Sequence, residues 1–493
     1  MRLALLLALM AGPAAAQVSF TDLSQALGDH TYAGGWEHFV GGGVAVMDCN
    51  GDARPDIFAA GGTTPAALWI NRGDFRFDPA PLPDLTETTG AYPIDIDGDG
   101  LLDLYVMRVG PDVALKGGPD CRFTDATADW GIPQTDQWTT AFTAWWEAES
   151  DRPVMAVGHY VDRSNPDGPF FACDTNTILR PAPTGYSAET LAPGFCPLSM
   201  LAATDARGRM TLRLSNDRQY YVRGGSEQMW DIMDRRFLTE ADGWKEVSLW
   251  GMGIASADVT GDGRDDVMLT SMGDQLLQLA QPDGTYVPAP YGIGTYAQRP
   301  YLGDDGRPST GWHSEFGDVD NDGRLDLFIA KGNVDQMPTN AMADPNNLLI
   351  QRPDGTFEEV AATAGLADTH RARGAALADF DGDGRLDLVV VNRRAPMLLY
   401  RNDTPATGQW LGLALTQANG NTQAIGARIT VTTPDLTQTR EIRVGGGHAG
   451  GQALPLHIGL GPATAADVTV TWPDGTTTTQ TLPADTLARL SHD

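Results

Sequence analysis

The sequence predicts an all-β chain in which a propeller of six or seven blades precedes a small β-sandwich-like C-terminal domain. Three observations predict it. A nine-residue acidic loop recurs along the chain, short strand-like segments flank each copy, and several copies are followed by a strand, a turn and an aromatic strand. Repeats of roughly 50 to 60 residues built from a few short strands are typical of propellers and solenoids.

The clearest copy of the acidic loop runs from Asp379 to Asp387. Carboxylates stand at positions 1, 3, 5 and 9. Gly384 stands at position 6, where the backbone must turn back sharply and glycine takes a left-handed conformation at little cost. The loop has no Cys or His, and its oxygens, with the carbonyl of Arg385 at position 7, suit a divalent cation with six to eight oxygen ligands. The sequence therefore predicts a calcium site.

Five copies of the loop are predicted to bind calcium, giving about five structural sites. Their predicted ligand residues are Asp48, Asn50, Asp52, Arg54 and Asp56; Asp95, Asp97, Asp99, Leu101 and Asp103; Asp258, Thr260, Asp262, Arg264 and Asp266; Asp318, Asp320, Asp322, Arg324 and Asp326; and Asp379, Asp381, Asp383, Arg385 and Asp387. Asn50 and Ala53 predict a weaker first site, and Thr260 a weaker third one. A decayed copy at residues 147–155 has Arg152 in place of the glycine, so no metal is expected there.

A helix-loop-helix calcium hand is excluded by the residues around the loops. Such a hand needs a bidentate Glu at position 12, but the three complete copies have Val106, Ile329 and Val390 there. The segments before and after the loops, such as 43–47 and 388–392, are short, apolar and rich in branched or small residues. They are typical of strands, so each loop is expected to join two β-strands.

The propeller is predicted to span residues 17–408. The last repeat, around 398–403, lacks its aromatic strand, and the segment 19–23 resembles the missing piece. If that segment completes the last blade, the ring closes and no sheet edge is left exposed, which favours a propeller over an open solenoid. Residues 162–245 are predicted to be an irregular insertion, with one eroded blade at most, so the sequence leaves six and seven blades open.

Residues 1–16 have the pattern of a secretory signal peptide. Arg2 precedes an apolar run over residues 3–10, and small residues lead to an expected cleavage after Ala16. The chain is therefore expected to be secreted or periplasmic. The segment is too short to anchor the chain in a bilayer, and no later segment has eighteen uninterrupted apolar residues, so no membrane span is expected.

The four cysteines support the same expectation. Cys49, Cys121, Cys173 and Cys196 form an even set in a chain expected to be exported, which favours disulfides over metal thiolates. Three pairings are possible. Cys173 with Cys196 is favoured because these residues bracket a Pro-rich segment that a bridge would restrain, and free buried thiols are the alternative.

Charge and motifs exclude several classes of function. A formal net charge of −30 and a pI near 4.4 exclude nucleic acid and anionic lipid as partners, since both need a basic surface. The eight histidines form no paired metal spacing, and the sequence has no nucleophile elbow, phosphate loop or dinucleotide fingerprint. No catalytic or organic-cofactor residue is therefore predicted.

The acidic loops, with Gly-rich strands before them, resemble the FG-GAP or VCBS repeats of integrin-type propellers. Residues 409–493 resemble the ASPIC/UnbV domain. The motifs that carry this second resemblance are Gln409-Trp-Leu-Gly-Leu413, Ile425-Gly-Ala-Arg-Ile-Thr-Val431, Arg440-Glu-Ile-Arg-Val-Gly-Gly-Gly447, Leu456-His-Ile-Gly-Leu-Gly461 and Val468-Thr-Val-Thr-Trp-Pro-Asp-Gly475. Together they are similar to the cartilage acidic protein family and its bacterial relatives, over essentially the whole mature chain.

The acidic loops and the resemblance to the FG-GAP and ASPIC/UnbV families together imply an exported, non-enzymatic, calcium-binding propeller. It is expected to act in adhesion or in recognition of a protein or glycan. The alternative is a propeller enzyme, or an accessory protein of carbohydrate processing, with a site at the central channel shaped by residues 162–245. Fold-level similarity does not by itself distinguish the two.

Overall fold

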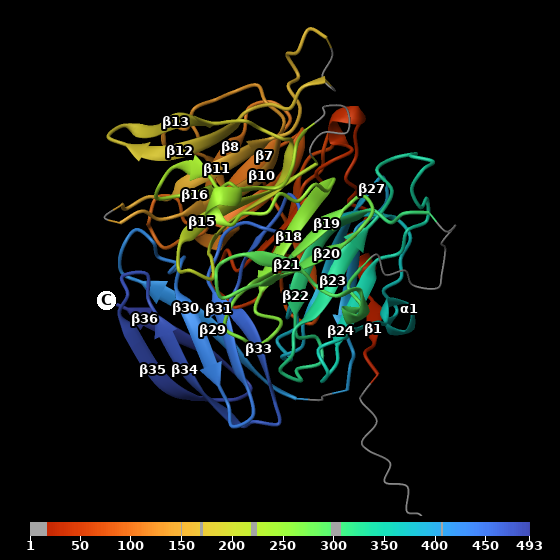
Figure 1. The fold of residues 1–493 in the computed structure, drawn as a ribbon, viewed down its shortest axis with the longest axis vertical. Coiled ribbons are helices and arrows are strands. Elements are labelled where there is room, and N and C mark those ends of the chain that lie inside the picture. The colour runs from red at the N-terminus through yellow and green to blue at the C-terminus, as the bar shows by residue number, and fades with distance from the viewer. Residues whose placement is uncertain (1–16, 149, 168–170, 218–223, 297–306, 406–407) are drawn as a thin grey trace, which may run out of the picture.

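In the part of the chain that the structure describes, seven sheets of consecutive antiparallel strands follow one another around a ring and form a seven-bladed propeller, with a two-sheet unit packed against it (Figure 1). The computed structural model describes residues 17–493 except 149, 168–170, 218–223, 297–306 and 406–407. The predicted signal peptide, residues 1–16, and Glu149 of the decayed loop lie outside the described residues.

The first three blades take up residues 44–191. Blade 1 contains β2 (Val44–Met47), β3 (Asp56–Ala59), β4 (Ala67–Asn71) and β5 (Phe77–Ala80). Blade 2 contains β6 (Thr88–Ile94), β7 (Asp103–Arg108), β8 (Val113–Lys116) and β9 (Thr124–Asp125). Blade 3 contains β10 (Thr139–Trp145), β11 (Val154–His159), β12 (Asn176–Ala182) and β13 (Gly185–Leu191).

The other four blades complete the ring. Blade 4 contains β14 (Pro197–Thr204), β15 (Met210–Asn216), β16 (Gln228–Asp231) and β17 (Arg236–Phe237). Blade 5 contains β18 (Gly251–Ala257), β19 (Asp266–Ser271), β20 (Leu276–Ala280) and β21 (Tyr286–Pro288). Blade 6 contains β22 (Gly311–Gly317), β23 (Asp326–Lys331), β24 (Asn347–Gln351) and β25 (Phe357–Glu359). Blade 7 contains β26 (Arg371–Ala378), β27 (Asp387–Arg393), β28 (Leu398–Asn402) and β1 (Phe20–Asp22).

The helices of the described residues are all short. They are α1 (Ala361–Ala364), η1 (Ser24–Leu27), η2 (Trp36–His38), η3 (Pro119–Cys121), η5 (Glu240–Asp242) and η6 (Tyr291–Ile293).

The N-terminal strand closes the ring, as the sequence predicts. In β1, Phe20 pairs with Asn402 and Asp22 with Tyr400 of β28, so blade 7 takes its fourth strand from the start of the propeller. The inner strands β2 and β26 also pack against each other, which joins the first and last blades. Pairing the two ends of the propeller in one sheet leaves no open end in the ring.

The predicted insertion at residues 162–245 is instead largely regular structure. Its described part holds β12 and β13 of blade 3 and all of blade 4. The first two strands of blade 4 are joined by a tight turn, in which the Asp205 carboxylate accepts the N–H groups of Arg207 and Arg209 at 2.8 and 2.9 Å. Because this turn replaces an acidic loop, the repeat signature is missing from the blade, and the sequence pattern could not settle the blade number.

Both cysteine pairs are disulfides. Cys173 is bonded to Cys196, as favoured from the sequence, and Cys49 is bonded to Cys121. The first bridge joins the β11–β12 connection of blade 3 to the segment before blade 4, and the second joins the acidic loop of blade 1 to blade 2.

The C-terminal unit is a sandwich of two sheets. One sheet contains β29 (Gln409–Gln417), β33 (Leu456–Gly461) and β36 (Thr486–His492), and the other contains β30 (Arg428–Thr432), β31 (Thr437–Glu441), β34 (Ala465–Thr471) and β35 (Thr477–Pro483). Alternating apolar residues from both sheets form its core, which includes Leu411, Ile429, Ile458 and Val470, each fully buried. Burial of such alternating faces against each other is what holds two sheets together.

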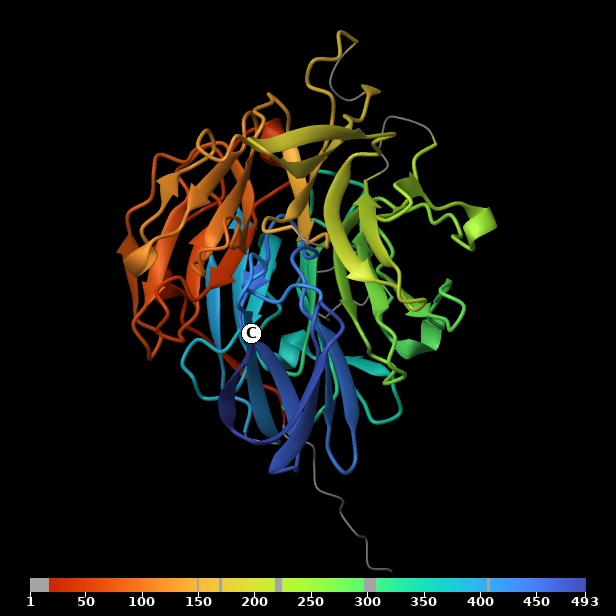
Figure 2. The ribbon, with the colours of Figure 1, turned by 90° about the vertical axis from the view of Figure 1, so that its left-hand side faces the viewer.

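A glycine-rich segment links the sandwich to the centre of the propeller. Residues 444–453, which include β32 (Gln452–Ala453), leave the sandwich after β31 and lie between the blades (Figure 2). Bridges join Val444 to blade 3, Gly445 to blade 4, Gly447 to blade 5 and Gly450 to blade 2, and β32 pairs in parallel with β2. This chain segment therefore lies between the inner strands of five blades.

His448 is the buried side chain at the tip of this segment. Its Nε2 accepts the Gly41 N–H at 3.3 Å, its backbone N–H donates to His313 Nδ1 at 3.1 Å, and its ring lies 5.0 Å from that of Trp312. Burial, reinforced by the charge of Arg373, lowers the pKa of His448 to about 3. The folded protein therefore holds this imidazole neutral.

Substituting His448 by Gln is expected to weaken the acid destabilisation of the protein. Above pH 6.5 the imidazole is neutral in both states, whereas below it the unfolded chain takes up a proton that the folded protein does not. The free energy of unfolding of the wild type should therefore fall by about 1.6 kcal/mol between pH 6.5 and 5 through this residue alone. Urea unfolding at both pH values measures the effect, and His370→Gln, at an exposed histidine, is the matched control. An equal acid response in wild type and His448→Gln would contradict the expectation.

Candidate metal centres

The five acidic loops occupy the same place in their blades. Each joins the inner strand to the second strand, in blades 1, 2, 5, 6 and 7. In all five, the N–H at position 7 donates to Oδ1 of the position 5 carboxylate. These donors and their distances are Arg54, 3.0 Å; Leu101, 2.9 Å; Arg264, 3.0 Å; Arg324, 2.9 Å; and Arg385, 3.0 Å. The shared bond shows that the five sequences fold into one type of turn.

The position 1 carboxylate organises this turn from inside. In the blade 7 loop, Asp379 Oδ1 accepts the N–H of Gly382 at 2.7 Å, and its Oδ2 accepts the N–H of Gly384 at 2.8 Å. Gly384 has φ = 83°, as expected for the residue at position 6. In the blade 1 loop the same position is Ala53, which has φ = 65°, a conformation that is strained for a residue with a Cβ.

The position 9 carboxylate fixes the loop to the rest of its blade. Asp387 Oδ2 accepts the N–H of Phe380 and its Oδ1 accepts the N–H of Asn402 in β28, both at 2.8 Å. Asp56, Asp103 and Asp326 make the corresponding pairs of bonds. The sequence predicts these residues only as ligands. The structure adds that each one holds the loop to the third strand of its sheet or, for Asp103, to Gly117 directly after that strand.

The three complete loops bring their carboxylates together. Oxygens from Asp95, Asp97 and Asp99, from Asp318, Asp320 and Asp326, and from Asp379, Asp381 and Asp387 lie within 4.8 Å of one another in each set. Asp97 Oδ1 and Asp320 Oδ1 are buried without a hydrogen-bond partner. Clustered hard oxygens, some of them lacking partners, fit a divalent cation such as calcium.

The electrostatics of the clusters favour a cation as well. Burial, and then the neighbouring Asp322 and Asp320, raise the pKa of Asp318 well above its ordinary value. Burial, and to a smaller extent the neighbouring carboxylates of Asp383 and Asp381, raise the pKa of Asp379 to about 6, although the amides of the turn act in the opposite direction. Repelling, desolvated carboxylates need a proton or a cation.

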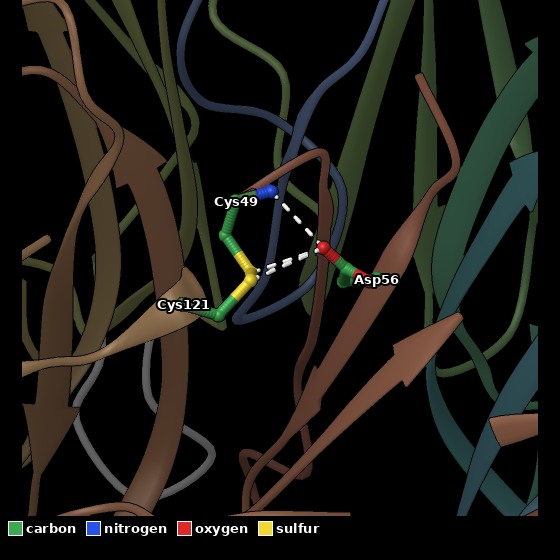
Figure 3. Close-up of side chains that lie close together, drawn as sticks. All are labelled: Cys49, Asp56 and Cys121. Atoms are coloured by element: carbon green, nitrogen blue, oxygen red, sulfur yellow. Dashed lines mark hydrogen bonds between the residues drawn. A yellow bond between two sulfur atoms is a disulfide. The ribbon is translucent and has the colours of Figure 1, made fainter. Parts of the chain in front are cut away.

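The loops of blades 1 and 5 do not form such a cluster from their predicted ligands in the described structure. In blade 1, Asp56 instead lies against the bridge between Cys49 and Cys121 (Figure 3). Asp56 Oδ2 is 3.0 Å from Cys49 Sγ and 3.4 Å from Cys121 Sγ. Because both sulfurs are in a disulfide, this group offers no thiolate to a metal. The weaker binding expected from Ala53 and Thr260 remains a prediction.

Each loop also holds a basic side chain, which the sequence does not predict. In four loops it is the arginine at position 7, whose backbone carbonyl alone is predicted to act. These pairs are Arg54 with Asp52, Arg264 with Asp262, Arg324 with Asp322 and Arg385 with Asp383. In the blade 2 loop, where position 7 is Leu101, Lys116 at the end of β8 takes this role and contacts both Asp97 and Asp99.

The C-terminal sandwich rests on the loops. Thr422 Oγ1 donates to Asp95 Oδ2 at 2.5 Å, and His457 Nε2 lies 2.8 Å from Asn321 Oδ1. A cavity of about 940 Å³ lies between the two domains, lined by residues of the loops, of the sandwich, of the glycine-rich segment and of the inner strands of blades 4 to 7. No local sequence signal marks these contacts, because they join residues more than one hundred positions apart.

The decayed copy connects β10 and β11, at the same place in blade 3 as the other loops. Its first carboxylate, Glu147, pairs with Arg180 of β12. The described part of this loop forms no cluster of three metal-ligating side chains.

Two known protein families match this chain, one in the propeller and one in the C-terminal sandwich. Residues 48–106, 258–329 and 318–390 match the family described as FG-GAP-like repeat, and residues 417–493 match the family described as ASPIC and UnbV. The chain is an FG-GAP repeat protein with an ASPIC/UnbV domain after the propeller. The matched ranges contain all five acidic loops, in blades 1, 2, 5, 6 and 7.

Curated relatives of this FG-GAP protein are animal proteins. Cartilage acidic protein 1 of Homo sapiens is 29% identical over 162 residues, which are 32% of this chain and 24% of that protein. The Mus musculus protein is also 29% identical over 162 residues, 32% of this chain and 25% of that protein. The matched region thus spans about a quarter of the length of these relatives.

Among solved structures, BBS1N in complex with ARL6DN resembles this FG-GAP protein with a TM-score of 0.47. The sequences are 11% identical, and the match covers 80% of this chain and 98% of that chain. In the described residues, no helix is long and apolar enough to cross a bilayer.

Proposed function

We propose that this FG-GAP protein is an exported, non-enzymatic, calcium-binding propeller that acts in adhesion or in recognition of a protein or glycan. The observation that carries the calcium part is the convergence of carboxylate oxygens in the three complete loops. Export is supported by the two disulfides, which form and persist in oxidising compartments.

In each complete loop the proposed ligands are the carboxylates of positions 1, 3, 5 and 9 and the carbonyl of position 7. A bound calcium ion would supply the positive charge that the clustered carboxylates lack. The chain itself holds the remaining geometry, because the amide of position 6 orients the position 1 carboxylate and the third strand of the blade orients position 9. The ion is therefore proposed to be structural.

Recognition by the assembled surface is the proposed role, because the glycine-rich segment occupies part of the centre of the ring, and the cavity of about 940 Å³ beside it is where the enzyme alternative would place its site. The inner strands of five blades contact the glycine-rich segment. The match covers 24% of cartilage acidic protein 1, so the name of that protein indicates no partner for this chain.

Replacing Asp381 and Asp383 together by Ala is expected to remove one bound calcium ion per chain. The two carboxylates are positions 3 and 5 of the blade 7 loop, and neither is needed for the position 9 contact that fixes the loop to β28. Elemental analysis after dialysis at fixed free calcium gives the ion count, and calorimetric titration gives the affinities.

The matched control is Asp354→Ala, which removes an exposed aspartate from an ordinary hairpin turn of blade 6. An equal ion count in the double variant and the control would refute the assignment of the blade 7 site. The same samples, assayed on glycans and esters with and without calcium, should show no turnover, and calcium-dependent turnover would instead support the enzyme alternative.

A further inference from the structure

The blade 2 loop differs from the other four in the source of its positive charge. Residues 95–103 contain four aspartates and no basic residue, whereas every other loop has an arginine at position 7. Lys116, at the end of β8, reaches into the loop from the third strand of the same blade. Its ammonium donates to Asp97 Oδ2, and also to Asp99 Oδ2 at 2.6 Å.

The position of this ammonium also differs from that of the arginines. In blades 6 and 7, Arg324 and Arg385 pair with the position 5 carboxylate, and within the described chain Asp320 and Asp381 at position 3 form no ion pair. In blade 2 the single ammonium contacts positions 3 and 5 together. These are two of the carboxylates that a calcium ion in this loop would have to share.

A lysine is suited to this role. Its ammonium is a compact charge with three donors on a flexible stem, so it can bridge two carboxylates at once. Because Lys116 belongs to the same chain as the loop, its ammonium competes with calcium for the carboxylates at a fixed effective concentration. A calcium ion that entered this loop would have to replace the ammonium at both carboxylates. The displaced ammonium would then lie close to a dipositive ion, which repels it.

We propose that Lys116 is a tethered counter-ion that keeps the blade 2 loop closed to calcium at concentrations that fill the loops of blades 6 and 7. This inference rests on the proposed calcium binding and refines it, because a loop with a complete set of carboxylates becomes independent of calcium. The blade that is joined to blade 1 by a disulfide would then also keep its loop ordered without an ion.

Lys116→Met tests the proposal, since methionine retains the unbranched stem without the charge. The variant is expected to bind one calcium ion more per chain than the wild type at the same free calcium, with the affinity of that loop raised roughly tenfold or more. Adding Asp97→Asn should abolish the gain, whereas Asp97→Asn alone should leave the wild-type count unchanged. Lys245→Met, at an exposed lysine outside the loops, is the control.

A second measurement uses the wild-type protein and does not depend on how a variant folds. The chain has only three lysines, so amine-reactive labelling followed by peptide mass analysis reports on each one separately. Labelling of Lys116 should not change with calcium at concentrations that fill the other loops. Labelling that increases as calcium binds, or an unchanged ion count in Lys116→Met, would overturn the proposal. A wild type that binds no calcium would instead overturn the proposed function.

Discussion

Removal of calcium by a chelator at neutral pH is expected to lower the melting temperature of the protein by several degrees. An ion that binds only the folded state adds about 2.7 kcal/mol at a free concentration one hundred times its Kd. In domains of 150 to 250 residues, 1 kcal/mol corresponds to about 2–4 °C, and the shift per kcal/mol is smaller in larger ones. The clusters in blades 6 and 7 lie on adjacent loops, where Asn321 Nδ2 donates to the Gly384 carbonyl at 2.8 Å, so losing both ions should weaken one shared region.

Differential scanning calorimetry of the calcium-loaded and chelated protein measures this shift. The chelated protein should regain its original melting temperature when calcium is returned in excess. The Asp381→Ala, Asp383→Ala double variant should show a smaller shift than the wild type, because one of its ions is already absent. A melt that stays the same after thorough chelation would count against calcium in every loop.

The parts of the fold that the sequence predicts are those set by local spacing. Carboxylates two residues apart followed by glycine define a turn of local hydrogen bonds. The N–H groups of Gly382 and Gly384 donate to Asp379, all within six residues. The closing strand is also predictable, because Phe20 and its neighbours resemble the strands that end the other blades, although it pairs with residues near 400. Here a repeat supplied the long-range information.

The parts that the sequence does not predict depend on contacts without a repeat. Blade 4 has a tight turn at Asp205 in place of the loop, so its strands carry no landmark. The path of residues 444–451 through the centre of the ring pairs them with four blades far away in sequence, and a glycine-rich run by itself equally fits a plain hairpin. Lys116 lies 13 residues after the loop that it neutralises, and only the register of β8 against β7 brings it back.

Gly90→Ala is expected to destabilise the protein by about 3 kcal/mol or more, at the upper end of the cost of overpacking a core. A Cβ at this position would lie 1.6 Å from the Ala449 carbonyl oxygen in the glycine-rich segment. That neighbour is backbone, and it cannot move aside by rotating a side chain. Gly90 is on the inner strand of blade 2, beside the bridge between Ala91 and Gly450, so the clash should push the segment away from the blade.

Gly292→Ala is the matched control, because a Cβ there would meet no atom within 4 Å and the backbone of neither glycine is in the left-handed region. Denaturant unfolding gives the free energies, and limited proteolysis reports whether residues 444–453 have become accessible. We expect Gly90→Ala to be both less stable and cleaved faster in this segment. If it unfolds and is cleaved like Gly292→Ala, the segment does not lie against blade 2. The reason for placing the function on the outer surface of the propeller would then be lost, because the centre of the ring would be open.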